Sequence, residues 1–431
     1  MSGTHAHDVV IVGGGPGGYA AGLYAAGIGL DVGLVESNKI GGTCLHVGCI
    51  PAKELLETAH VYRTVRDAAE FGVVAGEPAI DWSTTMERKQ AIVDQLAGGV
   101  ATLLKGRKAT VYDGVGRLGA DRTVTVTGGE SDGTVLTGRA VILATGSVPR
   151  TIPGFEVDGR FVVTSDEFLS IEKLPASAVV IGGGAIGCEF ASTMGDLGVD
   201  VTVLEALPQI LTGCDADATK VVERSFKKRG ITVRTGVAVT GHTPDPSGDT
   251  TTVSFGDGES LSVELVVVSV GRRPVTEGLG ADEAGVAVDD RGFIVADDRC
   301  RTTASGVWAV GDVINTPQLA HVAFAEGMLA VRDLLGEEPA PLDHHGTPWC
   351  IYCHPEVAFA GHTEESAIAA GYDVATSSHR FIGNGRAKIV GDTDGIVKVI
   401  AEKQPDGTGG RILGVHMVGP WVTEQLGQGY L

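Results

Sequence analysis

Basic residues are scarce in this sequence of 431 residues. Lysine and arginine together number 33, against 54 aspartates and glutamates, and the formal net charge is -21. Binding to nucleic acid or to an anionic membrane requires a basic face. The charge balance therefore argues against both kinds of partner.

The sequence also lacks the basic segment with which a secretory signal begins, since MSGTHAHD contains neither lysine nor arginine. Residues 9–30 are uncharged, but their cluster of glycines indicates a buried strand, turn and helix rather than a membrane span. Cysteine is sparse as well. Seven cysteines, an odd number without a signal, indicate a reducing cytoplasm. We expect a cytoplasmic protein in which any disulfide is catalytic rather than structural.

Glycine, in contrast, is abundant: 64 of the 431 residues are glycine, about twice the average usage of ~7%. The length suggests roughly three domains, at about 150 residues each. Two segments, 8–36 and 178–205, share one pattern: an apolar β-branched run, G-x-G-x-x-G, a helical stretch and a second strand ending in glutamate. The same number of residues separates the first glycine from the glutamate in both. The glycines are Gly13, Gly15 and Gly18 in the first copy, and Gly182, Gly184 and Gly187 in the second.

This pattern is typical of a dinucleotide-binding unit. Its first glycine makes a tight turn, its second lets the backbone approach a pyrophosphate, and its third lets the helix pack on the strand. The pyrophosphate sits at the positive N-terminus of the helix, and Glu36 or Glu205 can accept hydrogen bonds from a ribose. One such motif is a weak signal, but two copies with full strand context predict two bound dinucleotides.

Further predicted strands indicate an α/β fold. The strand in residues 140–150 leads into Thr145 and Gly146, and the strand in 306–313 delivers Asp312, which can bind a hydroxylated chain such as the ribityl group of a flavin. Turn-forming residues predict hairpins at 128–133 and 245–249. After Pro341 we expect a separate α+β segment with strands at PEVAFAGHT, GRAKIVGD, GIVKVIAE and GRILGVHMVG.

Cys44 and Cys49 form the most chemically suggestive pair. In a regular helix they would lie about 7.5 Å apart along the axis, whereas the Cβ atoms of a disulfide lie about 3.8 Å apart. Bridging them requires a distorted first turn, which Gly48 and Pro51 make available. A strained bridge at a helix start is easily reduced, and the helix dipole favours a thiolate there. Two buried free thiols are the ordinary alternative, but the neighbouring dinucleotide unit favours a redox pair.

The segment GGTCLHVGCIPAK (41–53) resembles the redox-active signature of the class I pyridine-nucleotide disulfide oxidoreductases. The other motifs occur in that family's order, so the resemblance covers essentially the whole chain. Within the family, the cysteine segment and ILGVHMVGP (412–420) are most similar to the dihydrolipoamide dehydrogenases. Departures from the family pattern are His46, Ala52 and Cys188.

The resemblance implies two Rossmann-like domains and an α+β interface domain. The FAD-binding domain would comprise 1–150 and 275–343, the NAD-binding domain 151–274, and the dimerisation domain 344–431. Cys44 would exchange with the substrate dithiol, Cys49 would lie against the flavin, and Lys53 would sit near the flavin, paired with Glu189. Glu36 and Asp312 would bind FAD, and Glu205 the NAD ribose. The remaining cofactor-binding residues would be Thr43, Lys53, Thr145, Gly146, Gly271 and Ala320, with His321 close to the flavin.

The nicotinamide cofactor can also be argued from the residues. A 2′-phosphate would be repelled by Glu205, and no arginine follows in EALPQIL. NAD is therefore preferred over NADP. The implied reaction is oxidation of dihydrolipoyl groups, carried on a lipoyl protein or domain, by NAD through the disulfide and FAD. The implied setting is a homodimer serving a 2-oxoacid dehydrogenase or glycine-cleavage complex.

Three further observations bear on this interpretation: a possible metal pattern, the C-terminal end, and other functions within the family. Cys350-Ile-Tyr-Cys353-His354 spells a haem-attachment pattern and, with nearby histidines, suggests zinc, but the matching family segment is an interface strand without metal, so no metal is expected. The family's His-Pro-x-x-x-Glu base would follow the helix in which the sequence ends at Leu431, so the chain is expected to be C-terminally truncated. The other functions considered are a flavin-dependent reductase of a low-molecular-weight thiol, or a redox-impaired flavoprotein interaction subunit.

Overall fold

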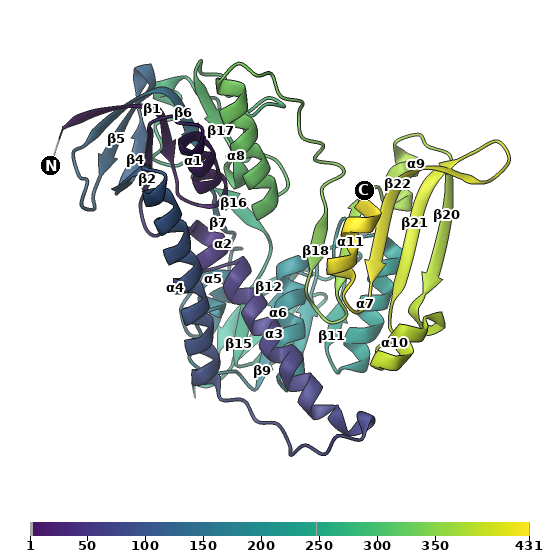
Figure 1. Cartoon of the computed structure of the whole chain (residues 1–431). Coiled ribbons are helices and arrows are strands. Elements are labelled where there is room, and N and C mark those ends of the chain that lie inside the picture. The colour runs from purple at the N-terminus through teal and green to yellow at the C-terminus, as the bar shows by residue number, and fades with distance from the viewer. Residues whose placement is uncertain (1–2, 247, 431) are drawn as a thin grey trace. The chain divides into compact units, whose positions relative to one another are not determined.

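The computed structural model describes residues 3–246 and 248–430, and the chain divides into two compact units (Figure 1). The first consists of Met1–Pro51, Lys89–Val148 and Arg272–His344. The second consists of Ala52–Arg88, Pro149–Gly271 and His345–Leu431. The boundaries fall within helices α3 (Cys49–Arg66) and α4 (Trp82–Gly106) and at the short strands β7 (Ser147–Pro149) and β16 (Arg272–Pro274).

The first unit is built on a seven-stranded sheet of order β3-β2-β1-β6-β5-β4, with β17 paired to β6. Its strands are β1 (Thr4–Val12), β2 (Val32–Glu36), β3 (Thr110–Asp113), β4 (Val115–Leu118), β5 (Thr123–Thr127), β6 (Val135–Leu143) and β17 (Val307–Ala309). Its helices are α1 (Pro16–Gly27), α2 (Gly42–His46) and α8 (Ala320–Leu334), with 3₁₀ turns η2 (Ala120–Arg122), η3 (Asp282–Ala284) and η4 (Gly311–Val313). β1 runs parallel to both β2 and β6, and its Val9–Val12 run is buried, as expected of a parallel strand covered on both faces.

The second unit contains a five-stranded parallel sheet of order β11-β10-β9-β15-β8. Its strands are β8 (Val162–Thr164), β9 (Ser177–Ile181), β10 (Asp200–Leu204), β11 (Thr232–Arg234) and β15 (Leu265–Val268). Beside it stands an antiparallel sheet of β12 (Val239–Pro244), β13 (Thr251–Phe255) and β14 (Glu259–Val263). The helices here are α5 (Ser165–Phe168), α6 (Ala185–Asp196) and α7 (Ala216–Lys228), with η1 (Ala68–Phe71) after α3.

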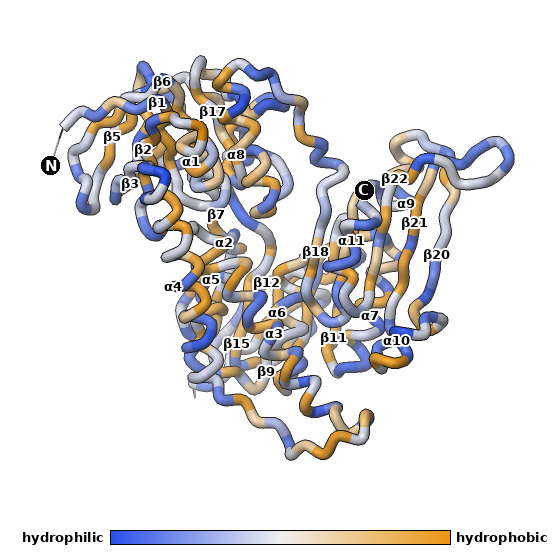
Figure 2. The backbone as a smooth tube through the Cα atoms, viewed as in Figure 1, coloured by the Kyte–Doolittle hydropathy of each residue, from blue (hydrophilic) through white to orange (hydrophobic). Residues whose placement is uncertain are grey.

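The C-terminal part of the second unit is an antiparallel sheet of order β18-β19-β22-β21-β20. Its elements are β18 (Trp349–Ile351), β19 (Val357–Gly361), α9 (Glu364–Ala369), β20 (Val374–Arg380), η5 (Phe381–Gly383), α10 (Gly385–Val390), β21 (Ile396–Lys403), β22 (Gly409–Val418) and α11 (Val422–Tyr430). Figure 2 shows the hydropathic contrast between the apolar β21 and the polar edge strand β20. A polar edge resists pairing with other chains.

The secondary structure confirms both predicted hairpins: β5 pairs antiparallel with β6, and β12 with β13. The strand predicted for GRAKIVGD was wrong, because this segment forms α10. The Asn384 side chain accepts hydrogen bonds from the N–H groups of Arg386 and Ala387, and Gly391 ends the helix with a φ of 82°. Asparagine and glycine at these places are helix caps, and they outweigh the apolar alternation between them.

Candidate functional site

The two glycine-rich turns have the same geometry, one in each unit. A Cβ atom built on Gly13 would lie 2.2 Å from the carbonyl oxygen of Ala144, and one built on Gly182 would lie 2.5 Å from that of Ser269. Both glycines also have a positive φ, 107° and 101°. The first glycine of each motif is therefore required by the chain's own backbone.

The third glycine of each motif is required in the same way. A Cβ atom on Gly18 would lie 1.8 Å from the carbonyl oxygen of Gly13, and one on Gly187 would lie 1.9 Å from that of Gly182. No side chain fits between these atoms. Each helix therefore packs directly on the turn that precedes it, as the motif predicts.

The second glycine of each motif behaves differently. A Cβ atom on Gly184 would meet nothing within 4 Å, and one on Gly15 would meet only the Cα of Gly42, at 3.9 Å. These two residues are the N-caps of α6 and α1, whose first turns carry no acidic side chain. The open space at a positive helix N-terminus fits the close approach of a pyrophosphate, so the described residues suit two dinucleotides.

Glu36 is the last residue of β2 and Glu205 directly follows β10, and each holds the glycine turn of its own copy. The Gly14 N–H donates to Glu36 Oε2 at 2.6 Å, and the Gly183 N–H donates to Glu205 Oε2, also at 2.6 Å. The other carboxylate oxygens accept from main-chain N–H groups two residues further on, at 2.8 Å and 2.7 Å. A carboxylate oxygen has two lone pairs, so each glutamate can still accept a hydrogen bond from a ribose.

Asp312 lies in η4 of the first unit and belongs to a side-chain network. The Ser147 hydroxyl donates to Asp312 Oδ2 at 2.5 Å, and Arg272 Nε donates to Ser147 Oγ at 2.7 Å. Arg272 Nη2 also donates to the Ser147 carbonyl oxygen at 2.8 Å. Sequence reasoning missed Ser147 and Arg272, although each directly follows a predicted cofactor glycine, Gly146 or Gly271. The network fixes the carboxylate proposed for the ribityl chain.

The other predicted cofactor residues occupy strand ends and helix starts. The Thr145 hydroxyl donates to the Val275 carbonyl oxygen at 2.6 Å, and Gly146 follows with a φ of 70°. Gly271 also has a positive φ, 105°, and Ala320 is the first residue of α8. Their roles toward FAD stay predictions, as does that of the exposed His321 next to Ala320.

Cys44 and Cys49 lie on two different helices rather than within one distorted turn. Cys44 is in α2, the chain breaks helical geometry at Val47 with a φ of -140°, and Cys49 is the first residue of α3. A Cβ on Gly48 would lie 2.9 Å from the Thr43 carbonyl oxygen. The close approach of the chain between the two helices therefore requires glycine at this position. The pair lies near disulfide distance. Thr43, predicted to contact FAD, precedes Cys44 in α2.

Tyr19, on α1 of the same unit, interacts electrostatically with this cysteine pair. Burial, and then negative charge on Cys44 and Cys49, raise the pKa of Tyr19 to about 12. Its ring centroid lies 5.5 Å from that of Phe324 on α8. Tyr19 stays a phenol at neutral pH and can act as a donor near the thiols. Sequence reasoning missed it, although it directly follows Gly18.

Lys53 and Glu189 form the ion pair that the resemblance implies. Lys53 Nζ lies 2.8 Å from Glu189 Oε1 and 2.9 Å from Oε2. The Tyr352 N–H also donates to Glu189 Oε1 at 2.9 Å, and Lys53 Nζ lies 5.1 Å from the Tyr352 ring centroid. Glu189 is buried while Lys53 is about one-third exposed. Tyr352 was missed because its segment was weighed only as a metal-binding pattern.

The cysteines of that segment face main-chain carbonyl groups. Cys350 Sγ lies 3.7 Å from the Thr423 oxygen, and Cys353 Sγ lies 3.3 Å from the Pro355 oxygen. Burial is the main cause that raises the pKa of both thiols. Within residues 3–246 and 248–430, no group of three or more His, Cys, Asp or Glu side chains is arranged to hold a metal ion. Among the same residues, no helix has the length and apolar character needed to cross a bilayer.

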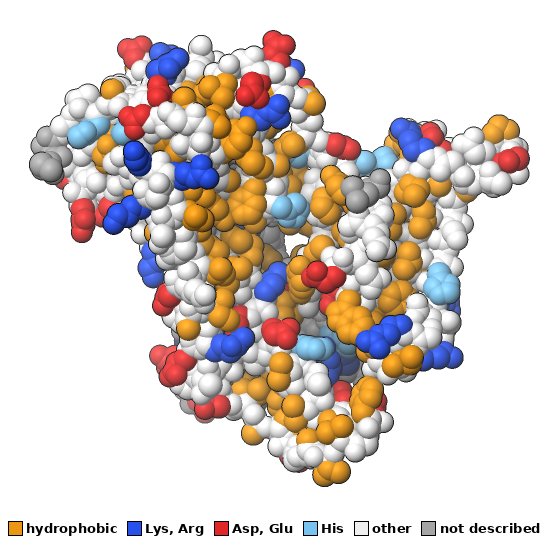
Figure 3. All heavy atoms as spheres, viewed as in Figure 1, with side chains coloured by type: hydrophobic (Ala, Val, Ile, Leu, Met, Phe, Trp, Pro, Cys, Tyr) orange, Lys and Arg blue, Asp and Glu red, His pale blue; other side chains and the backbone are white. Residues whose placement is uncertain are grey.

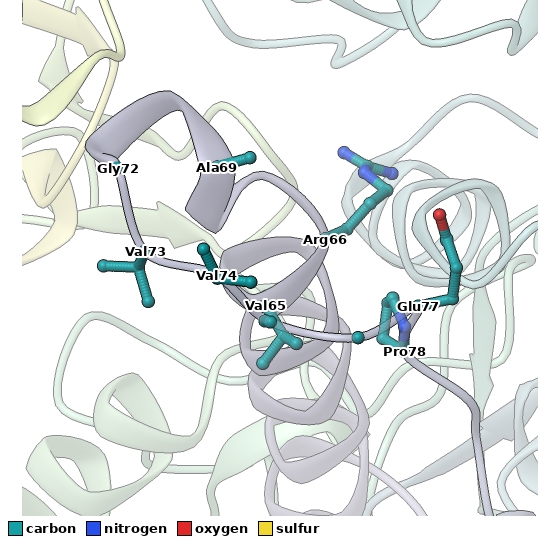
Figure 4. A pocket seen from close by; sticks show the side chains of 10 residues that line it. Val65, Arg66, Ala69, Gly72, Val73, Val74, Glu77 and Pro78 are labelled. Carbon is teal, nitrogen blue, oxygen red and sulfur yellow. The ribbon is translucent and has the colours of Figure 1, made fainter.

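A pocket of 280 Å³ lies where α3 ends, and Figure 4 shows its lining side chains. They belong to Val65, Arg66, Ala69 and the segment 72–78. Hydrophobic side chains gather over this segment at the bottom of the view in Figure 3, and Val74 is 99% exposed. None of the predicted site residues lines this pocket. Its lining mixes apolar side chains with the charged Arg66 and Glu77.

Two family models match the chain. The model described as pyridine nucleotide-disulphide oxidoreductase covers residues 7–327, and the model for the dimerisation domain of the same family covers residues 347–430.

Known proteins are similar over nearly the full chain. A dihydrolipoyl dehydrogenase of Bacillus subtilis is 43% identical over 98% of this chain and 90% of its own length. Among solved structures, LpdA of Mycobacterium tuberculosis matches with a TM-score of 0.89 and 26% identity, over 98% of this chain and 92% of that one. The HOCl-induced flavoprotein disulfide reductase RclA of Escherichia coli matches with a TM-score of 0.87 and 26% identity, over 99% and 92%.

Proposed function

The chain belongs to the pyridine nucleotide-disulphide oxidoreductase family, and on this basis we propose that it acts as a dihydrolipoamide dehydrogenase. The observation that carries the proposal is the position of the cysteine pair in the first unit. Gly42, the first residue of the helix that bears Cys44, lies beside Gly15 of the first dinucleotide turn. The cysteine pair, proposed as the redox disulfide, thus lies next to the dinucleotide turn that is proposed for FAD.

The chain's own residues support the following chemistry. A thiolate of the dihydrolipoyl group attacks Cys44 Sγ and displaces Cys49 as a thiolate, and the second substrate thiol then displaces Cys44 to release the cyclic disulfide. The N-terminus of α3 stabilises the Cys49 thiolate, because Cys49 is its first residue. Bound FAD supplies the two-electron centre between this dithiol and NAD. The family resemblance would place Lys53, which is paired with Glu189, near the flavin, where its ammonium would add a positive charge.

The proposed function is tested directly with purified protein. We expect a yellow protein that oxidises dihydrolipoamide with NAD and has at most weak activity with glutathione. Flavin absorbance measures the bound FAD, and the rate of NADH formation measures the activity with each thiol. Colourless protein that takes up no FAD would overturn the assignment, and faster turnover of glutathione disulfide with NADH would favour the low-molecular-weight thiol reductase instead.

Glu205 is proposed to make NAD the preferred nicotinamide cofactor. Its carboxylate stands at the strand end where a 2′-phosphate would lie. Glu205→Gln should lower the ratio of the turnover rate with NADH to that with NADPH by about tenfold, equivalent to ~1.4 kcal/mol. The matched control is Glu36→Gln, the same change in the other copy, which should leave this ratio unchanged. A native preference for NADPH would refute the assignment.

We infer a homodimer, supported by the dimerisation-domain match and by the exposed Phe71, Val73 and Val74 beside the pocket after α3. Exposed apolar side chains in one segment suit burial against a second copy. Lipoyl groups on a carrier protein of a 2-oxoacid dehydrogenase or glycine-cleavage complex, in the cytoplasm, are the proposed substrates and setting.

A further inference from the structure

Glu326 is a wholly buried carboxyl group with no part in the function described so far. It lies in the middle of α8 and has 0% exposure. Its neighbour Gly327 packs backbone to backbone against α1, because a Cβ on Gly327 would lie 2.6 Å from the Gly17 carbonyl oxygen. The carboxyl group is therefore enclosed where α8 meets the first dinucleotide unit. Burying such a group is costly unless it is satisfied.

One oxygen of Glu326 holds the turn that carries Asp312. The Gly311 N–H donates to Glu326 Oε2 at 2.6 Å, and Gly311 is the first residue of η4, with a φ of 72°. Ser147 holds the Asp312 side chain from the other direction. The proposed flavin-binding aspartate is thus fixed through its side chain by Ser147, and the residue before it, Gly311, is fixed by Glu326.

The other oxygen of Glu326 is arranged to carry a proton. Glu326 Oε1 has no hydrogen-bond partner, and neither has Thr316 Oγ1. His344 Nε2 lies 3.7 Å from Glu326 Oε1. A protonated carboxyl group has one O–H to donate, and these two neighbours can accept it. An ionised carboxyl would leave a buried charge beside Asp312.

The titratable groups that face Glu326 agree with this arrangement. Burial, and to a smaller extent the negative charge of Asp312, raise the pKa of Glu326 to about 7, against the lowering effects of the Gly311 N–H and the nearby Thr316 hydroxyl. Burial lowers the pKa of His344, against the raising effect of Asp343. Cys300 also faces the carboxyl, and its own pKa is raised by burial and then by Glu326. None of these groups supplies a fixed positive charge.

We propose that Glu326 is a positioning residue for FAD: it holds the Gly311–Val313 turn, and on losing its proton it leaves an uncompensated buried negative charge beside Asp312, which opposes that hold. The inference rests on the proposed binding of FAD by this unit. Because the pKa of Glu326 is raised above its ordinary value of 4.5, its contribution is fully present below pH 4.5 and is lost as the pH rises through about 7. FAD retention should follow the same course.

The test compares the native chain with two variants, using the flavin fluorescence that appears when FAD leaves the protein. The FAD dissociation constant of the native chain should rise about tenfold between pH 5.5 and 8, since one unit of pKa difference between the loaded and empty states gives a factor of ten. Glu326→Gln keeps an oxygen for Gly311 and an N–H₂ for Thr316, so it should retain FAD with no such dependence. Glu326→Leu should lose FAD at both pH values.

Asp333→Asn is the matched control, a buried carboxyl on the same helix that is paired with Arg301. It should lower stability without flattening the dependence of FAD retention on pH. If the native protein binds FAD but Glu326→Gln shows the same pH dependence as the native chain, this inference is wrong while the proposed function stands. If Glu326→Leu does not fold, the comparison of Glu326→Gln with the native chain still tests whether Glu326 causes the pH dependence of FAD binding.

Discussion

Replacing Cys44 or Cys49 with serine should lower dihydrolipoamide oxidation by about 10³-fold or more, the size of effect seen when a nucleophile is removed from a catalytic unit. A hydroxyl cannot form the disulfide, so electrons from the substrate have no route to the flavin. Both variants should nevertheless retain FAD, because neither cysteine belongs to the glycine turn or to the Asp312 network. The rate of NADH formation and the flavin absorbance of the purified variants measure the two effects separately.

The electron path on the nicotinamide side should survive in both variants. NADH should still reduce an artificial one-electron acceptor, since that reaction does not need the disulfide. Cys214→Ala is the control for loss of a thiol, because Cys214 is a buried core residue of the second unit. It should keep native activity. Normal lipoamide turnover in either serine variant would show that the proposed relay is wrong.

Replacing Lys398 with methionine should lower the free energy of unfolding by about 3 kcal/mol or more, which is the cost of removing one partner of a buried ion pair. Lys398 Nζ lies 2.9 Å from Asp215 Oδ1, 2.9 Å from Asp217 Oδ2 and 2.7 Å from Glu364 Oε2. Lys398 and Asp215 are 4% and 3% exposed. Without the ammonium, Asp215 is left buried without its counter-charge. Urea unfolding monitored by circular dichroism measures the change.

The loss of stability should depend on pH in a defined direction. Despite its burial, the pKa of Asp215 is lowered by hydrogen bonds from Lys398, Glu364 and Asp217, so its contribution is present above pH 3.8 and lost as the pH falls. The pKa of Lys398 is raised by its three carboxylates against desolvation, so its contribution is present below pH 10.5 and lost as the pH rises. The Lys398→Met variant should therefore be most destabilised near neutrality and approach the native protein in acid.

Lys220→Met is the matched control for this experiment. Lys220 Nζ lies 3.2 Å from Asp217, one of the carboxylates that Lys398 also contacts, but the Lys220 side chain is 69% exposed. Exposed ion pairs contribute about 0–1 kcal/mol. An equal loss of stability in the two variants would contradict the view that burial makes the Lys398 cluster important.

Local patterns made part of the structure predictable from the sequence. Each dinucleotide unit is encoded in under thirty consecutive residues, so glycine spacing and strand periodicity suffice to place Gly13, Gly182, Glu36 and Glu205. The hairpins at 128–133 and 245–249 follow equally from nearby turn residues. The Lys53–Glu189 pair, which joins residues far apart in sequence, came only from resemblance to a family.

Contacts between distant residues could not be predicted. Arg272, Ser147 and Asp312 are brought together by the fold, and so are Glu326 and Gly311, whose pairing depends on how α8 packs against α1. The short helix α10 shows the opposite difficulty. Its six residues alternate enough to suggest a strand, and only the capping residues at either end, Asn384 and Gly391, distinguish the two structures.

The shared hydrogen bonding of Glu36 and Glu205 has a consequence for redesigning cofactor preference. Glu205 accepts hydrogen bonds from two backbone N–H groups, those of Gly183 and Leu207. Any replacement chosen to admit a 2′-phosphate therefore leaves one or both of these donors without an acceptor. An arginine placed there would pair with the 2′-phosphate but would leave both N–H donors without an acceptor. A switch to NADP therefore calls for exchange of the whole turn following β10, with a new acceptor for Gly183, and single substitutions should yield enzymes with lower affinity for both nicotinamide cofactors.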